Sequence, residues 1–104
     1  MFVLLSALLA SEGAVKTITD YVFSNSWQLN ELNMRPGDEY SVLADLCDLR
    51  QGEVVRFIGF DDVDNHYGIF VFIRADGAVL EVSGDFSGPG HAHLQGLRAS
   101  LAKV

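Results

Sequence analysis

Three carboxylates lie within four residues of this chain, at Asp61, Asp62 and Asp64. Oxygen ligands at this spacing could hold a hard cation such as Ca²⁺ or Mg²⁺. The segment does not fit an EF-hand. Counted from Asp62, Tyr67 stands where glycine is required and Ile73 stands where a bidentate glutamate is required. Because aspartate and asparagine also cap their own turns, we favour a solvated loop between two strands.

Three histidines could instead supply imidazole ligands for zinc or another transition metal: His66, His91 and His93. If residues 91–93 are extended, both of their rings point to one side and can chelate together. In a helix, positions i and i+2 lie about 200° apart. Leucines at helical spacing over 94–101 favour the helix. We therefore expect exposed histidines near a helix N-terminus, and a small histidine-based metal- or ligand-binding domain stays as an alternative.

The known catalytic motifs are missing from the sequence. The glycine-rich segment 84–90 lacks the Gly-Lys-Ser/Thr ending of a phosphate-binding loop, and there is no Gly-x-Ser-x-Gly elbow. The single cysteine, Cys47, has no histidine near it in sequence, and we expect it on the inner side of a helix. We therefore expect a protein that is not an enzyme and that has no cofactor.

The charge of the chain points to a different kind of function. It carries 14 acidic and 7 basic residues, a formal charge of −7. Direct binding of nucleic acid needs an excess of lysine and arginine, so the balance argues against it. Nine of the acids lie within residues 31–64. We expect six aspartates to form one acidic binding face: Asp38, Asp45, Asp48, Asp61, Asp62 and Asp64. Such a face would attract a basic protein partner, for example a host protein that binds nucleic acids.

The elements that must position these residues follow from periodicity. Residues 38–50 place their apolar side chains on one side of a helical wheel and three of the aspartates on the other, which predicts an amphipathic helix closed by Gly52. Strand-like runs at 53–60, 67–74 and 78–83 predict an antiparallel meander with a type I′ turn at Asp76-Gly77. In the middle run both the odd- and the even-numbered residues are apolar, as in a central strand that is covered on both faces. In the third run apolar and polar residues alternate, as in a strand at the edge of a sheet.

The two ends of the chain are predicted to be helical. Residues 2–10 are apolar and leucine-rich but no basic region precedes them, so we expect buried structure rather than a signal peptide. The run is also far shorter than the ~20 residues that cross a bilayer, and we expect no membrane association. Whether residues 2–24 form one helix or two stays open. Residues 24–37 are rich in cap and turn residues and predict a connection.

Together these elements predict the fold class. We expect residues 1–104 to form a single α+β domain, with two to three helices packed on a small antiparallel sheet and a helix at the C-terminus. The sheet is the three-stranded meander at about 53–83. The lone cysteine fits a reducing, cytoplasmic compartment. The hydrophobic content of 49% is also compatible with a homodimer.

One segment resembles a known group of proteins. Residues 67–77 form an apolar run that ends in a charged residue and Asp-Gly, and Glu81-Val82-Ser83-Gly84 follows shortly after. This pattern resembles a hairpin in small phage- and prophage-encoded acidic proteins, and the size and acidity of the chain are similar to those of anti-CRISPR proteins. The resemblance implies an inhibitor that binds protein and blocks a basic nucleic-acid groove. An immunity or antitoxin protein that neutralises a basic toxin is the alternative.

Overall fold

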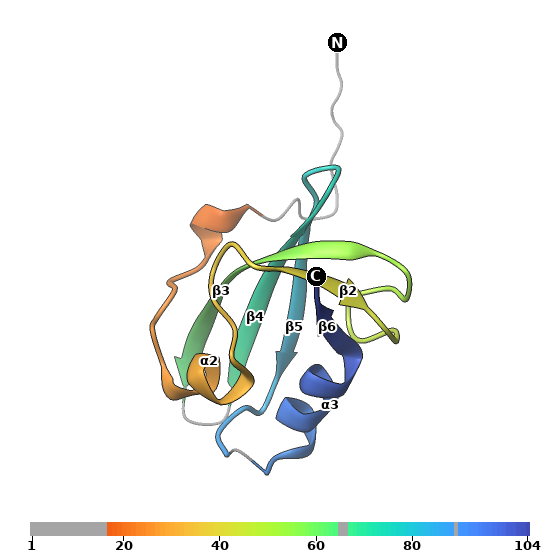
Figure 1. Ribbon diagram of the computed structural model, residues 1–104. Coiled ribbons are helices and arrows are strands. Elements are labelled where there is room, and N and C mark those ends of the chain that lie inside the picture. Colours follow the sequence, from red (N-terminus) through yellow and green to blue (C-terminus); the bar gives the residue numbers. More distant parts are fainter. Residues whose placement is uncertain (1–16, 65–66, 89) are drawn as a thin grey trace.

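The computed structural model describes residues 17–64, 67–88 and 90–104. Five antiparallel strands form one sheet in the order β5-β4-β3-β2-β6, with α2 and α3 beside it (Figure 1). The α+β class is therefore confirmed, with a larger sheet than predicted. The expected N-terminal run at 2–10 lies outside the described residues. The helix expected to continue to residue 24 is wrong in its described part, where only the 3-10 turn η1 is helical and Tyr21 is extended. In chain order the elements are η1 (Ile18–Asp20), α2 (Trp27–Leu32), β2 (Glu39–Val42), β3 (Val54–Asp64), β4 (Tyr67–Arg74), β5 (Val79–Gly84), α3 (Ala92–Ser100) and β6 (Leu101–Lys103).

The predicted meander is present as β3, β4 and β5, with β4 in the middle and β5 at the end of the sheet order. The turn between β4 and β5 is not type I′, because only Gly77 has a positive φ there, at 91°. The backbone N–H of Gly77 donates to the Arg74 carbonyl over 2.9 Å, and that of Arg74 donates to the Ala78 carbonyl over 2.9 Å. This pattern is typical of a three-residue turn with glycine in the last position.

A β-bulge in β3 decides which of its side chains face the core. Phe57 pairs with Phe72 and Gly59 pairs with Val71, so Ile58 is the extra residue. Before the bulge the odd-numbered residues Val55 and Phe57 face the core. After it Phe60 faces the core, and Gly59 is buried beneath Phe23. The bulge therefore turns Gly59 to the outer face of the sheet.

Phenylalanines dominate the core beneath the inner face of the sheet. Phe70 of β4 lies at the centre, with ring centroids 4.5 Å from Phe60 and 4.8 Å from Phe86, the second pair edge to face. Such pairs contribute about 0.5–1.5 kcal/mol beyond the area they bury. Leu94 and Leu97 of α3 are fully buried against the same cluster. The C-terminal helix was predicted from Leu94, Leu97 and Leu101. It is confirmed as α3, but Leu101 begins β6 instead of ending the helix.

The helix predicted at 38–50 is wrong. The structure has β2 there, followed by a loop at 43–53, because the β2 backbone pairs on both sides, with β3 and with β6. Tyr40 and Val42 are buried at the two-residue spacing of a strand, a pattern that the longer helical spacing of the leucines hid. The prediction of a plain connection at 24–37 is also wrong, since it contains the short helix α2.

Candidate functional site

The six aspartates predicted as one binding face do not lie on a helix, and they divide into separate groups. Asp38 precedes β2, where its carboxylate accepts a hydrogen bond from the Arg35 N–H over 3.2 Å and pairs with the Lys103 ammonium at 3.3 Å. Burial, and then the nearby charge of Asp38, raise the pKa of Tyr40 to about 12. Asp38 therefore stabilises the junction of β2 with β6.

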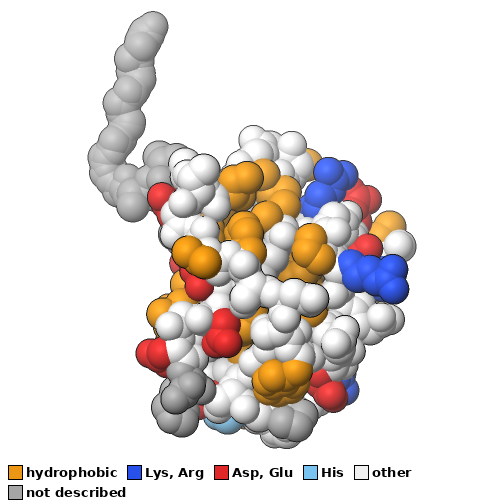
Figure 2. Space-filling view, turned by 90° about the vertical axis from the view of Figure 1, so that its left-hand side faces the viewer, with side chains coloured by type: hydrophobic (Ala, Val, Ile, Leu, Met, Phe, Trp, Pro, Cys, Tyr) orange, Lys and Arg blue, Asp and Glu red, His pale blue; other side chains and the backbone are white. Residues whose placement is uncertain are grey.

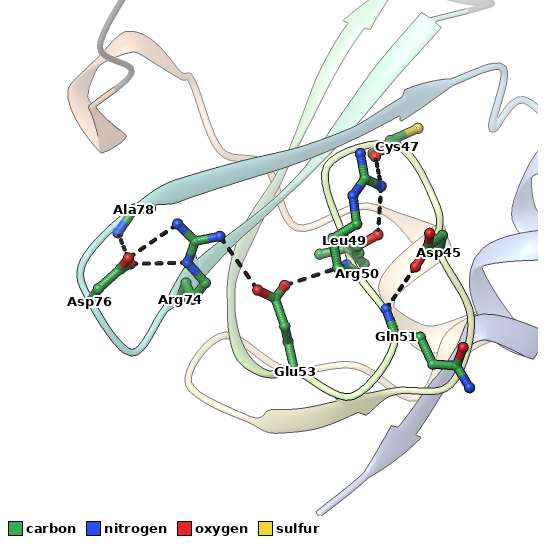
Figure 3. A network of polar contacts seen from close by, with 9 residues as sticks. All are labelled: Asp45, Cys47, Leu49, Arg50, Gln51, Glu53, Arg74, Asp76 and Ala78. Carbon is green, nitrogen blue, oxygen red and sulfur yellow. Dashed lines mark hydrogen bonds and ion pairs between the residues drawn. The ribbon is translucent and has the colours of Figure 1, made fainter.

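Asp45 and Asp48 hold the loop 43–53 in place. Asp45 Oδ1 accepts a hydrogen bond from the Gln51 N–H over 2.8 Å (Figure 3). The Asp48 carboxylate accepts from the backbone N–H of Glu81 over 3.0 Å, and the Asp48 N–H donates to the Glu81 carbonyl over 3.3 Å. Asp48 thus satisfies both backbone groups of Glu81 on the edge of β5, which attaches the loop to that edge.

The same loop continues into a chain of ion pairs that Figure 3 shows. Glu53 accepts from the Arg50 N–H over 3.3 Å and pairs with the Arg74 guanidinium at 3.4 Å. Arg74 also makes two contacts of 3.1 Å with Asp76. The hydrogen bonds from Arg74, and then from the Ala78 N–H, lower the pKa of Asp76. These carboxylates are therefore neutralised locally by arginine and backbone donors.

Cys47 does not face the core as predicted, since its side chain is exposed. Leu46 and Leu49 exchange hydrogen bonds of 3.0 and 2.8 Å, which makes Cys47 the first central residue of a two-residue turn. Its φ is 51°, a conformation that glycine adopts more readily than cysteine.

Asp61, Asp62 and Asp64 lie at the end of β3 rather than in the predicted loop, because β3 extends to Asp64. Asp61 Oδ2 accepts a hydrogen bond from the Val22 N–H over 3.3 Å. Asp62 and Asp64 line a small cavity together with the buried Gln28. The three carboxylates therefore do not form one site: Asp61 contacts the segment 21–24, whereas Asp62 and Asp64 line the cavity.

The segment 21–24 runs beside the end of β3, where Ser24 and Phe60 form an antiparallel bridge, and its aromatic side chains lie over the outer face of the sheet. The Ser24 N–H donates to the Phe60 carbonyl over 2.9 Å, which fastens the segment to β3. Phe23 then packs on Gly59 so closely that a Cβ at Gly59 would lie 2.6 Å from the ring. Tyr21 stacks on Phe23 with centroids 5.8 Å apart. The glycine is thus required for close approach of the two layers.

Tyr21 is the centre of a gathering of carboxylates. Its hydroxyl donates to Glu81 Oε2 over 2.5 Å. Burial, then Glu81, then the charges of Asp20 and Asp48, raise the pKa of Tyr21 above its ordinary value. Asp61 lies beside this group, because its carboxylate accepts the N–H of Val22, the residue after Tyr21. We name these four acids the Tyr21 acidic cluster: Asp20, Asp48, Asp61 and Glu81.

Sequence reasoning found two members of this cluster, Asp48 and Asp61, and missed the other two. The outward position of Glu81 on an alternating strand was its only signal, since its contact with Tyr21 depends on the path of residues 21–24. Figure 2 shows hydrophobic side chains gathered on the face that carries this segment, with acidic side chains down its left and basic ones on its right. Val22 and Phe23 are exposed there.

His91 and His93 lie at the start of α3, as predicted. His91 Nδ1 accepts the His93 N–H over 3.3 Å, and His93 Nδ1 accepts the Asp85 N–H over 2.8 Å. His91 Nε2 lies 3.4 Å from the Asp85 carboxylate. One nitrogen of each ring is therefore occupied by the backbone. Within residues 17–64, 67–88 and 90–104, no group of three or more His, Cys, Asp or Glu could hold a metal ion. His66 lies outside these ranges.

Comparison with known proteins gives no relative: no family model, no curated protein and no solved structure matches the chain. In the part of the chain that the structure describes, no helix has the length and apolar character needed to cross a membrane.

Proposed function

We propose that this chain is a non-enzymatic inhibitor that binds a basic protein through the acidic outer face of its sheet. The observation that supports the proposal is the Tyr21 acidic cluster, in which carboxylates from η1, the loop 43–53 and β5 act on one hydroxyl and Asp61 of β3 accepts the N–H of the next residue, Val22. Folding that places like charges together at the surface works against stability. Binding of a basic surface would offset that repulsion.

Apolar side chains beside the carboxylates would supply the short-range part of such an interface. Val22 is 79% exposed and Phe23 is 39% exposed. Both lie beside Asp61, whose carboxylate accepts the Val22 N–H. Interfaces often combine an aromatic contact at the centre with a charged rim. Long-range attraction by the acids would raise the association rate, and salt would screen it.

The kind of partner follows from this chemistry. A protein whose lysines and arginines bind phosphates presents the complementary surface, and the acidic cluster would occupy the place of the nucleic acid. The target is thus a nucleic-acid-binding protein of the host, in the manner of anti-CRISPR inhibitors. Capture of a toxin from the same genome would instead assign the chain to the immunity proteins.

The experiment is affinity capture at low and high salt with two matched variants. The first combines Asp20→Asn, Asp61→Asn and Glu81→Gln, which removes three charges from the cluster. The control combines Glu31→Gln, Glu39→Gln and Asp76→Asn, acids that pair with arginines elsewhere. We expect a basic partner that the wild type and the control retain at low salt and that the cluster variant loses. A partner that is not basic, or that the control loses equally, would contradict the proposal.

A further inference from the structure

A groove with a mainly apolar lining runs between the segment 23–25 and residues 35–36 (Figure 1). Its volume is about 500 Å³, within the range of about 300–1,000 Å³ that is typical of sites for small molecules. Its apolar lining comes from Phe23, Leu29 and Pro36. Such sites bind through apolar contact and use a few polar groups to orient the ligand.

Arg35 is the charged residue among the described residues that line this groove. It is exposed, and its guanidinium makes no hydrogen bond or ion pair with another residue of the described ranges. The other five basic side chains in those ranges each contact an acid or a backbone carbonyl: Arg50, Arg56, Arg74, Arg98 and Lys103. In a chain with 14 acidic and 7 basic residues, a cation left without an acid beside an apolar groove favours a ligand that brings a negative charge.

The acid closest to Arg35 along the described chain does not neutralise its guanidinium. The Asp38 carboxylate accepts the backbone N–H of Arg35 over 3.2 Å and pairs with the Lys103 ammonium at 3.3 Å. The acids elsewhere on the chain act at longer range, and salt screens exposed charges beyond about 8 Å at physiological ionic strength. A carboxylate that enters the groove therefore meets Arg35 without an acid of the described lining to repel it.

We propose that this groove binds a small amphipathic carboxylate, with its hydrocarbon tail against Phe23, Leu29 and Pro36 and its carboxylate on Arg35. Guanidinium and carboxylate form charge-assisted hydrogen bonds, and Ser24 and Asn25, which also line the groove, have side-chain donors for the same carboxylate. At the roughly 30 Å³ that a water molecule occupies in the liquid, the groove holds up to about 16 non-hydrogen atoms. A straight-chain acid of about ten carbons fits this space, and we expect a Kd on the order of 10⁻⁴–10⁻³ M.

This ligand is independent of the basic partner proposed above. Phe23 contributes to both surfaces, but no residue of the Tyr21 acidic cluster lines the groove. The test below contains no protein partner. Its failure would leave the proposed inhibitor untouched, and failure to capture a basic protein would leave the carboxylate site untouched.

The test is an NMR titration of the isotope-labelled full chain with decanoate, decanol and decylammonium, which share one hydrocarbon tail. We expect saturable shift changes centred on the amides of Ser24, Asn25, Arg35 and Gly59. Decanoate should bind about three- to tenfold more tightly than decanol, and decylammonium should bind most weakly. Equal binding of decanoate and decanol, tightest binding of decylammonium, or the absence of saturable binding would each overturn the proposal.

Two variants separate a specific contact from the general charge of the chain. Arg35→Gln should weaken the binding of decanoate about three- to tenfold and leave the binding of decanol unchanged. Arg56→Gln is the matched control, because it removes the same charge from an exposed arginine that pairs with Glu39 and does not line the groove. An equal loss of decanoate binding in the two variants would overturn the proposal.

Dilution of the ligand-free chain checks for a different occupant. If a second copy of the chain fills the groove, the amide shifts of Ser24, Asn25 and Gly59 change as the protein is diluted, and the proposal is wrong. We expect these shifts to be independent of protein concentration.

Discussion

The loop 43–53 and the outer-face segment 20–24 both bring acidic side chains to the surface, but their surroundings differ. In the loop, Glu53 pairs with Arg74, and Asp45 accepts a backbone N–H (Figure 3). On the outer face, the Tyr21 hydroxyl is surrounded by carboxylates that raise its pKa. Acids of both regions accept hydrogen bonds, but those around Tyr21 lie close enough together to act on one hydroxyl, and the fields of clustered acids add. The difference separates structural acids from candidates for binding.

The largest expected effect concerns the packing of the loop. Leu49 is fully buried, and Leu49→Ala should lower the free energy of unfolding by about 2–5 kcal/mol, because it leaves a cavity. Leu43→Ala is the control: Leu43 is 50% exposed, and we expect a change within about 0.5 kcal/mol. Denaturant unfolding measures both. If the two variants lose similar stability, the loop does not depend on its buried leucine.

The outer face should respond to a single methyl group. Gly59→Ala places a new Cβ against the Phe23 ring and 3.2 Å from the Cβ of Phe23. Because the segment 21–24 must then shift, we expect the free energy of unfolding to fall by about 1–3 kcal/mol. Gly96→Ala is a control of opposite sign, because nothing lies within 4 Å of that position in α3 and alanine favours helix by up to about 1 kcal/mol. Hydrogen exchange at residues 21–24 should accelerate only in Gly59→Ala.

The turn of the loop should gain stability from glycine. Cys47→Gly relieves the positive φ of 51° and should raise the free energy of unfolding by ~0.5 kcal/mol. Cys47→Ala keeps the strain and should leave the stability nearly unchanged. The side chain contributes little, because its contact with the Ser83 carbonyl is 3.9 Å long. A loss of stability in both variants would show that the sulfur matters more than the backbone.

The smallest effect is the pH dependence of the β4–β5 turn. Arg74 lowers the pKa of Asp76 in the folded protein, so this carboxylate favours folding above its ordinary pKa of about 4 and loses the effect as the pH falls through the lowered value. The stability of wild type minus that of Asp76→Asn should therefore be positive near neutral pH and shrink in acid. A difference that does not change with pH would contradict the ion pair.

Local patterns predicted some elements well and others poorly. The meander and α3 were predictable because β5 and α3 each pack on a single face, which gives a regular apolar spacing, and because β4 is buried on both faces, which gives a continuous apolar run. The helix predicted at 38–50 was wrong, because Val42 is buried in a strand and Leu49 in a loop, and the spacing of the two also fits a helix. The cluster around Tyr21 was beyond prediction, because Asp20 and Glu81 meet only through the tertiary path of residues 21–24.

The cavity beside Gln28 shows the same limit. Asp62 and Asp64 stood out in the sequence, but Gln28, which lines the cavity with them, comes from α2, a helix that the sequence pattern did not reveal. Nothing in the residues around Gln28 indicates that its amide would be buried against Phe86. Contacts between side chains of distant segments can be read only from the fold itself.

The central claim is that the outer face, rather than the loop, binds basic partners. NMR titration of the labelled chain with an arginine-rich peptide tests this directly, because it needs no knowledge of the natural target. We expect salt-sensitive shift changes centred on the amides of Asp20, Tyr21, Val22 and Asp61, with little change at Asp45, Gln51 and Asp76. Changes centred on the loop, or spread evenly over every acidic residue, would contradict the account.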